Sequence, residues 1–416
     1  MRIAIIGAGI SGIAVAHRLH LAHDVTVFEA DGRPGGHANT IRVDTAYETH
    51  HVDTGFIVFN DRNYPNFERL LADGGVASQA SEMSFSVADE SGDFEYNGAS
   101  PNGLFAKRAH LAKPWFHRMV LDLARFNRAA RELLTGDDEG PSLGEWLERH
   151  RFSRPFVERL IVPQAAAVWS ADPTQMWSFP ARFMVEFFDH HGMLGFAGRP
   201  KWRTIRGGSH NYVRALIAPW RERLRLSTPV RSLQRFEDRV EVHAAGALEP
   251  ERFDHVVLAT HSDQALKLLG CGATDTEREL LSAIPYQDNE AILHTDAGLL
   301  PRRRRAWASW NYHLLAEPTG RVAVTYHLNR LQSLRAAEQF CVTLNRSQAI
   351  DPEKIIRKID YAHPVYTNAG IKAQARHAEI DGRNRTSFCG AWWGSGFHED
   401  GAASGVRVAE RLERAP

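Results

Sequence analysis

Cysteine is scarce in this sequence. Its 416 residues include three cysteines, Cys271, Cys341 and Cys389, whose spacing matches no metal-binding pattern. So few cysteines exclude a disulfide framework and fit a reducing compartment. His190 and His191 are adjacent, so they share neither a helix face nor a strand face. We therefore expect no metal site.

Long hydrophobic runs and an excess of charge are also missing. No apolar run approaches about 18 residues, so no membrane-spanning helix is expected. Met1 and Arg2 lead directly into an apolar strand, which leaves no room for a signal peptide and predicts a cytoplasmic protein. Fifty basic residues balance fifty acidic ones, so no overall field favours nucleic acid. Peripheral contact with the inner face of a membrane stays open.

The amino-terminal segment contains the most specific pattern of the chain. Residues 3–6 form an apolar run of strand length, residues 7–12 match G-x-G-x-x-G, and apolar residues at helical spacing follow over 13–21. A second apolar run over 25–28 ends at Glu29. These pieces predict the opening βαβ unit of a dinucleotide-binding fold, with Glu29 accepting hydrogen bonds from the ribose hydroxyls.

Each residue of the glycine loop has an expected task. Gly7 makes the tight turn, Gly9 lets a pyrophosphate approach the backbone, and Gly12 lets the helix pack closely on the strand. The pyrophosphate is expected at the helix N-terminus, beside Ile10 and Ser11. Unpaired N–H groups and the helix dipole favour negative charge there.

The residues after the second strand resemble the flavin-containing amine oxidase superfamily, which includes monoamine oxidases, protoporphyrinogen oxidases, phytoene desaturases and fatty-acid double-bond isomerases. Its members carry an E-A-x-x-R-x-G-G-R segment that wraps the pyrophosphate and ribityl chain of FAD. Here a histidine replaces the final arginine, which leaves a group whose charge depends on pH. The resemblance implies FAD contacts for Glu29, Ala30, Arg33, Gly35, Gly36 and His37.

Further stretches carry the resemblance along the chain. Residues 53–56 resemble a D-x-G-G-type turn near the flavin ring, with a phenylalanine in place of one glycine. Residues 386–402 resemble the final strand and helix, with an alanine in place of a common acidic residue. This helix is expected to begin near Gly401 and to point at the flavin N1 and O2 edge. The implied FAD contacts are Thr54, Gly55, Phe56, Val230, Thr260, Gly390, Ala391, Asp400, Gly401 and Ala402.

The resemblance implies an α/β fold, in which a Rossmann-like FAD-binding domain of the glutathione-reductase-2 type is interleaved with an α+β substrate domain. We expect the FAD domain to comprise residues 1–75, 200–285 and 376–416, and the substrate domain 76–199 and 286–375. No second strand–G-x-G-x-x-G–helix unit is present, so no NAD(P)H domain is expected. Electrons must come from the substrate and leave to oxygen, quinone or another acceptor, or return to the substrate in an isomerisation.

The expected substrate domain is aromatic and carries two basic stretches. Residues 114–134 predict an amphipathic helix with four arginines on it, and residues 302–305 are all arginine. Each stretch is read either as a surface for anionic lipid or as ordinary solvated protein. The helix residues expected on the buried side are Leu121, Leu123, Ala124, Phe126 and Leu133. Seven aromatic residues of this domain are expected either to line an apolar substrate site or simply to pack in the core. They are Trp169, Trp177, Phe179, Phe183, Phe187, Phe188 and Phe196.

Tyr366 and His398 fall where, by the resemblance, amine oxidases place the two aromatic walls of the reaction site. A Tyr/His pair suits proton transfer better than it suits an amine cage, and a structural role fits His398 equally well. No cysteine lies near Tyr366, so we expect non-covalent FAD.

We therefore predict an FAD-dependent oxidoreductase that removes a hydride from a small apolar molecule. The preferred form is desaturation or double-bond isomerisation of a fatty-acyl chain. The subgroup that the sequence resembles often accompanies cyclopropane-fatty-acid-synthase-type methyltransferases. The alternatives are an amine oxidase that produces aldehyde, ammonia and hydrogen peroxide, a flavin-binding scaffold without turnover, and carotenoid-type or porphyrinogen-type oxidation.

Overall fold

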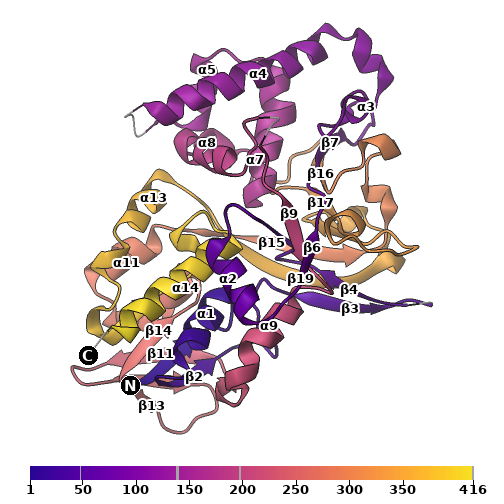
Figure 1. The fold of residues 1–416 in the computed structure, drawn as a ribbon. Helices are drawn as coiled ribbons and strands as arrows, with labels where there is room; N and C mark the ends of the chain where they lie inside the picture. The colour runs from indigo at the N-terminus through magenta and orange to yellow at the C-terminus, as the bar shows by residue number, and fades with distance from the viewer. Residues whose placement is uncertain (47, 137–139, 196–197, 415–416) are drawn as a thin grey trace.

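A five-stranded parallel sheet combines strands from the first, middle and last parts of the chain (Figure 1). The computed structural model describes residues 1–46, 48–136, 140–195 and 198–414. The predicted βαβ unit is present, because β1 pairs in parallel with β2 and α1 lies between them in sequence. In the order β10-β2-β1-β14-β20, the strands are β10 (Leu224–Arg225), β2 (Asp24–Phe28), β1 (Arg2–Ile6), β14 (His255–Leu258) and β20 (Thr386–Phe388).

Both faces of this sheet are buried, as expected for a parallel sheet. Ile3 and Ile5 of β1 pack in one core, whereas Ala4 and Ile6 pack in another, because successive side chains of a strand point to opposite faces. The first face is covered by α1 (Ile10–Leu19), α2 (Pro65–Asp73), α9 (His210–Ile217) and α14 (His398–Glu413). The second is covered by β11 (Val230–Arg235), β12 (Val240–Ala244), β13 (Glu251–Phe253), α10 (Ser262–Leu269), α11 (Asp275–Ser282) and α13 (Asn368–Ala375).

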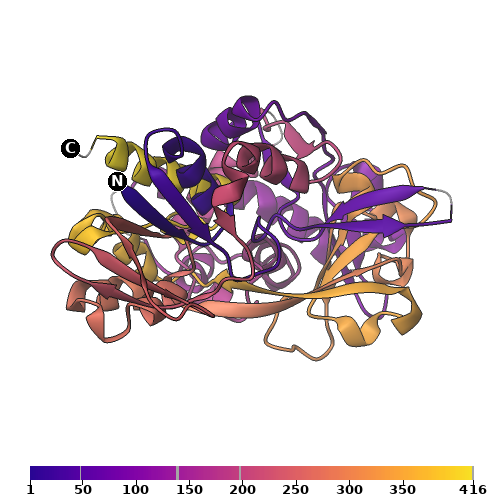
Figure 2. The same cartoon turned by 90° about the horizontal axis from the view of Figure 1, so that it is seen from below.

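A seven-stranded mixed sheet forms the second lobe. Its strands β15 and β19 are long and antiparallel, and they extend from the parallel-sheet lobe into the second lobe (Figure 2). In the order β19-β15-β18-β17-β16-β7-β8, the strands are β19 (Ile355–Pro364), β15 (Tyr286–His294), β18 (Cys341–Leu344), β17 (Val324–His327), β16 (Trp310–Leu314), β7 (Phe85–Asp89) and β8 (Glu95–Asn97). All of them come from segments expected to form the substrate domain, although the domain boundaries themselves stay a prediction.

Short strands and a helix connect the lobes. A hairpin forms from β3 (Thr40–Asp44) and β4 (Thr49–Asp53). The other connecting elements are β5 (Val58–Asn60), β6 (Ser78–Ala80), β9 (Trp202–Ile205) and α12 (Leu328–Leu331).

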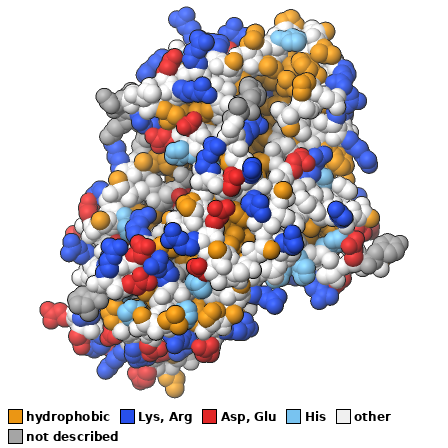
Figure 3. Space-filling view, in the orientation of Figure 1, with side chains coloured by type: hydrophobic (Ala, Val, Ile, Leu, Met, Phe, Trp, Pro, Cys, Tyr) orange, Lys and Arg blue, Asp and Glu red, His pale blue; other side chains and the backbone are white. Residues whose placement is uncertain are grey.

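Helices cover one face of the second sheet. They are α3 (Pro101–Leu104), α4 (Pro114–Thr135), α5 (Leu143–Arg149), α6 (Arg154–Phe156), α7 (Val162–Trp169) and α8 (Ala181–His190). The predicted long helix is confirmed as α4, but the prediction that Leu121 is buried was wrong, since it is 63% exposed. Ala124 is exposed too, while Leu123 and Leu133 are half-buried and Phe126 is buried. The buried stripe instead uses Phe116, Met119, Asp122, Phe126, Ala129 and Ala130, and hydrophobic side chains remain visible at this end (Figure 3).

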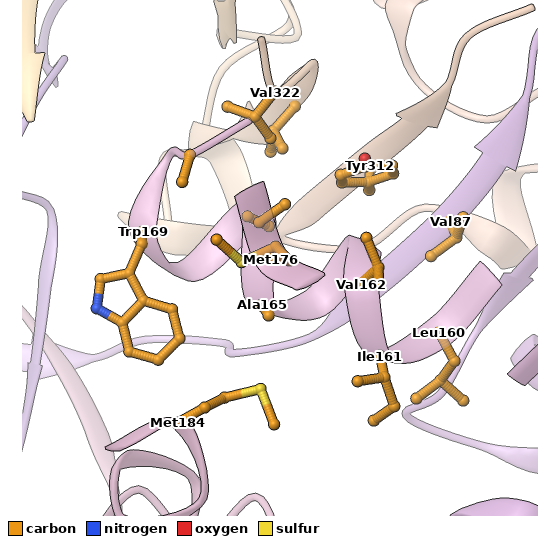
Figure 4. Close-up of a cluster of buried hydrophobic side chains, with 14 of the residues drawn as sticks. Val87, Leu160, Ile161, Val162, Ala165, Trp169, Met176, Met184, Tyr312 and Val322 are labelled. Atoms are coloured by element: carbon orange, nitrogen blue, oxygen red, sulfur yellow. The ribbon is translucent and has the colours of Figure 1, made fainter. Parts of the chain in front are cut away.

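Between α6 and α7 the helix widens into a π-helical turn, Val157–Ile161. Pro163 has no N–H, and in a regular α-helix its ring would clash with the carbonyl group four residues earlier, that of Arg159. The Tyr96 hydroxyl donates to that carbonyl oxygen at 3.1 Å and so satisfies it. Apolar side chains of this turn and of α7 pack with Val87 and Tyr312 of the sheet (Figure 4).

Candidate functional site

The loop between β1 and α1 leaves open space over Gly9. Gly7 has φ of +104°, and a Cβ atom there would lie 2.6 Å from the carbonyl oxygen of Ala259. A Cβ atom at Gly12 would overlap the carbonyl oxygen of Gly7, whereas one at Gly9 would meet no atom within 4 Å. Gly9 is also the N-cap of α1, and no side chain caps that helix. The first N–H groups of α1 are thus available to an anion.

The second glycine motif rests directly on the first. The Gly35 N–H donates to the carbonyl oxygen of Ala8 at 2.7 Å, and a Cβ atom on Gly36 would lie 3.3 Å from the Cα atom of Gly9. Arg33 donates to the carbonyl oxygens of Ala38 and Gly36 at 3.3 and 2.9 Å. This arginine therefore holds the loop in shape around the open space.

Glu29 lies at the end of β2, as the motif requires. Its carboxylate accepts the Ala8 N–H at 2.7 Å and the Asp31 N–H at 2.9 Å. Each carboxylate oxygen keeps a further lone pair for a ribose hydroxyl. Val230 begins β11 nearby, where the Thr228 N–H donates to the Glu29 carbonyl oxygen at 2.8 Å.

The turn after β4 docks on the same loop. The Phe56 N–H donates to the carbonyl oxygen of His37 at 2.7 Å, and a Cβ atom on Gly55 would overlap that oxygen. The Thr54 hydroxyl donates to the carbonyl oxygen of Asn39 at 2.9 Å. The turn that carries Phe56, where the family motif has a glycine, is therefore held against the loop by backbone hydrogen bonds.

The carboxy-terminal stretch closes the other side of this space. The Trp392 indole donates to the Thr260 carbonyl oxygen at 2.9 Å, and the Gly390 N–H donates to the Ser404 hydroxyl at 3.1 Å. The helix α14 begins at His398, three residues earlier than expected. It starts there because the Asp400 carboxylate accepts the N–H of Phe397 at 2.8 Å.

The N-termini of α1 and α14 come together in this way. A Cβ atom on Gly401 would lie 2.8 Å from Cγ2 of Ile10, so the Ile10 side chain packs directly on the backbone of α14. Four segments thus meet at the carboxyl ends of β1, β2, β14 and β20 (Figure 1). They are the glycine loop, the second glycine motif, the turn after β4 and the carboxy-terminal stretch. Open α/β sheets bind ligands at this edge, and the open space at Gly9 beside an uncapped helix fits the diphosphate of FAD.

Three histidines meet beside this edge, and the sequence analysis did not foresee their meeting. The ring of His37 lies 6.2 Å from that of His261 and 5.4 Å from that of His363, measured between centroids, and it stacks on Tyr361 at 4.8 Å. Burial, with the positive charge of neighbouring histidines, holds the pKa of His37 well below its usual value. A partial indication was present in the sequence, because His261 directly follows Thr260 and His363 lies three residues before Tyr366, and Thr260 and Tyr366 were candidate site residues. The meeting of the three histidines itself depends on the fold.

Tyr366 lies in the wall of the second lobe. Its ring stacks on Phe183 at 5.1 Å, and its hydroxyl is buried without a hydrogen-bond partner. A Cβ atom on Gly396 would lie 2.5 Å from that hydroxyl, so only glycine leaves room for it. A buried, unpaired hydroxyl of this kind is available to a ligand.

His398 is buried, and its contacts are with Phe56, Phe67 and Tyr212. Its ring stacks on Phe56 at 3.6 Å, and its Nε2 lies 2.7 Å from the Tyr212 hydroxyl. Burial lowers the pKa of His398 to about 3 and raises that of Tyr212 well above 10, so the tyrosine donates and Nε2 accepts. Within the described residues, no hydrogen bond or ring contact joins His398 to Tyr366.

An aromatic cluster surrounds Tyr366. Trp169 lies 4.7 Å from Phe179 and 5.0 Å from Phe187, and Phe187 stacks on Phe397 at 4.7 Å. Phe397 was not among the residues predicted for the site, although it directly precedes His398. Trp177 is 41% exposed and lies outside the cluster, and Phe196 lies outside the described residues. Over the described ranges, no group of histidine, cysteine or acidic side chains is arranged to hold a metal ion.

Comparisons with known proteins agree with this geometry. The model of the family described as "Flavin containing amine oxidoreductase" matches residues 10–298. Protoporphyrinogen oxidase 2, chloroplastic/mitochondrial, from Arabidopsis thaliana is 27% identical over 195 residues, which are 44% of this chain and 36% of that relative.

Two solved structures share the fold over nearly the whole chain. One is a cyclohexylamine oxidase from Brevibacterium oxydans IH-35A, with a TM-score of 0.69, 16% identity and 99% of each chain covered. The other is a CLA-producing fatty acid isomerase from P. acnes, with a TM-score of 0.69, 18% identity, and 99% of this chain and 98% of that chain covered.

Proposed function

The chain belongs to the flavin containing amine oxidoreductase family, and from that premise we propose that it removes a hydride from a fatty-acyl chain, by desaturation or by double-bond isomerisation. The supporting observation is the wall around Tyr366, where Phe183, Phe187 and Phe397 pack together in place of a facing Tyr/His pair. Such a wall suits an apolar chain, which needs contact area and exclusion of water.

FAD supplies the hydride acceptor when bound, and this chain supplies binding, orientation and a dry site. The hydroxyl of Tyr366 is the polar group that meets the substrate in this proposal. An unsatisfied buried hydroxyl costs about 1–3 kcal/mol, and a hydrogen bond to the substrate or to a transferred proton offsets that cost. In desaturation the substrate loses a hydride and a proton, whereas in isomerisation the hydride returns to a different carbon as the double bond moves, and no proton is lost overall.

His398 acts as a positioning residue in this account. Its neutral imidazole accepts from Tyr212 and stacks on Phe56, which lies in the turn that docks on His37. Because burial holds its pKa near 3, it does not take up a proton at neutral pH. As the first residue of α14, it ties the beginning of that helix, near Asp400 and Gly401, to Phe56 and Tyr212.

Amine oxidation is the second candidate, because a structural neighbour is described as a cyclohexylamine oxidase. Another neighbour of equal TM-score is described as a fatty acid isomerase, so the shared fold does not choose between them. The local chemistry around Tyr366 favours the apolar chain.

The test is anaerobic mixing of the purified holoenzyme with unsaturated phospholipids, free unsaturated fatty acids or simple amines, while flavin absorbance and product are recorded. The proposal predicts bleaching by lipid with a new double bond, or a moved double bond without net bleaching. Bleaching by amines alone, with aldehyde released, assigns the second candidate. Unchanged flavin and unchanged lipid reject the fatty-acyl proposal.

A further inference from the structure

Positive charge is concentrated in one internal segment of a chain whose basic and acidic residues otherwise balance. Residues 105–131 contain seven Lys or Arg and one acidic residue, Asp122, a difference of six, whereas the whole chain carries 50 of each sign. The side chain of Asp122 is fully buried and binds Arg118 and Arg125. One carboxylate therefore faces two guanidinium groups, and the surface of this segment stays basic.

Exposed apolar side chains lie on the same segment. Leu111, in the 3-10 turn η1 (Arg108–Ala112), is 55% exposed, and Leu121 of α4 is 63% exposed. On α4, Arg118, Leu121, Arg125 and Arg128 are all exposed. Their spacing of three, four and three residues makes them one stripe of the helix. Leu121 is thus an exposed leucine at the centre of three exposed arginines.

The arginine run comes to the same place. Arg305 belongs to the 3-10 turn η7 (Arg304–Ala306), and its carbonyl oxygen would lie 3.3 Å from a Cβ atom on Gly103 of α3. Arg303 forms an ion pair with Glu95, and Arg302 donates to the backbone carbonyl oxygen of Glu90 at 3.0 Å. Arg302, Arg304 and Arg305 are exposed. Figure 1 shows the segment around residue 305 next to α3, which leads into η1 and α4. Two basic stretches about 200 residues apart thus form one surface, which we call the basic end.

We propose that the basic end, made of residues 107–128 and Arg304–Arg305, docks on an anionic phospholipid bilayer. Leu111 and Leu121 enter the interface, and the surrounding arginine and lysine side chains bind the phosphate groups. Charge complementarity commits the surface to a lipid partner rather than to a second copy, because two identical basic ends repel each other. Over the described residues, no helix is long and apolar enough to cross a membrane, so this contact is with the bilayer surface.

The first test is co-sedimentation of the holoenzyme with vesicles of phosphatidylglycerol and phosphatidylcholine, against vesicles of phosphatidylcholine alone. We expect binding to the anionic vesicles, reversed by salt. The double variant Leu111→Glu/Leu121→Glu should bind at least about tenfold more weakly, because it removes buried apolar area and adds like charge to the anionic surface. The matched control is Leu21→Glu/Leu248→Glu, since these leucines are also highly exposed but lie on the parallel-sheet lobe. It should bind like the parent.

Several outcomes would overturn the proposal. They are no binding to anionic vesicles at low salt, equal binding to both vesicle types, or equal losses in both double variants. Self-association that disappears only in Leu111→Glu/Leu121→Glu would reassign the surface to a second copy. For each double variant, flavin absorbance and a melting temperature equal to those of the parent exclude misfolding as the cause of weaker binding. The proposal is independent of the substrate, because lipid oxidation in detergent tests the chemistry without a bilayer.

Discussion

His37 stands where the family carries an arginine, and its neighbours are His261, His363, Arg33 and His398 rather than a carboxylate. Burial keeps its ring neutral near pH 7, whereas a bound diphosphate favours the protonated form. FAD binding should therefore take up protons, and FAD should dissociate more slowly at pH 6 than at pH 8.

We predict that His37→Arg removes this pH dependence, because arginine is charged throughout that range. The measurement is the rise in fluorescence as FAD leaves the holoenzyme. An equally steep pH dependence in the variant would place the responsible group elsewhere.

Tyr366 carries the second prediction at the scale of a residue. Tyr366→Phe removes a hydroxyl that has no partner, so the melting temperature should stay unchanged or rise. If that hydroxyl meets the substrate, kcat should fall by roughly tenfold or more. Unchanged kcat together with unchanged stability would reduce Tyr366 to a part of the apolar wall.

At the scale of elements, the sequence predicted the opening βαβ unit and the long helix α4 well, because each has a local cause. The glycine spacing, the acidic end of β2 and the proline that begins α4 act within a few residues of themselves. The burial of Leu121 could not be predicted in this way, because which side of α4 faces the sheet depends on partners far away in the sequence. The start of α14 depended on the carboxylate of Asp400 reaching back to Phe397.

The π-helical turn supplies a prediction for an element. Tyr96→Phe should remove the donor to the part-buried Arg159 carbonyl and lower the free energy of unfolding by about 1 kcal/mol. Pro163→Ala restores a backbone N–H at position 163, which can donate to the Arg159 carbonyl oxygen in its place. The double variant should therefore recover much of the lost free energy of unfolding. Urea unfolding of the parent, both single variants and the double variant measures this. Strictly additive effects would show that proline and tyrosine act independently.

At the scale of the whole molecule, the site could be predicted in outline but not in its side-chain chemistry. The open space at Gly9 follows from a motif, whereas the meeting of His37, His261 and His363 needs β14 and β19 to approach the loop after β2. The joining of the arginine run to the start of α4 is likewise a product of the fold. Contacts between distant segments leave no periodic trace in a sequence.

Buried histidines predict how the stability of the whole chain depends on pH. Burial lowers their pKa to about 3 or 4 in the folded state, against about 6.5 when unfolded, so the unfolded chain binds more protons below pH 6.5. Each therefore destabilises the fold by about 2 kcal/mol at pH 5 relative to pH 7. The group comprises His191, His255, His294, His313, His363 and His398.

Three carboxyl groups act in the opposite direction, and burial raises the pKa of one of them, Glu399, above its usual value. Burial raises the pKa of Asp53 and of Asp400 to about 6, so each adds about 1 kcal/mol of stability between pH 7 and pH 5. Six histidines outweigh three carboxyl groups, and the free energy of unfolding should fall by several kcal/mol over this range. Denaturant unfolding at pH 5, 6 and 7 measures it, and equal or greater stability at pH 5 would contradict the prediction.

The most direct test of the account is the conversion of an unsaturated fatty-acyl lipid that carries deuterium on the carbons next to its double bond. The holoenzyme is mixed with this lipid, or with its undeuterated form, and the change in double bonds is followed by mass spectrometry. Removal of a hydride from the acyl chain predicts that the deuterated lipid is converted more slowly. Both lipids remaining unchanged, while a simple amine yields its aldehyde and reduces the flavin, would contradict the account and assign the protein to amine oxidation.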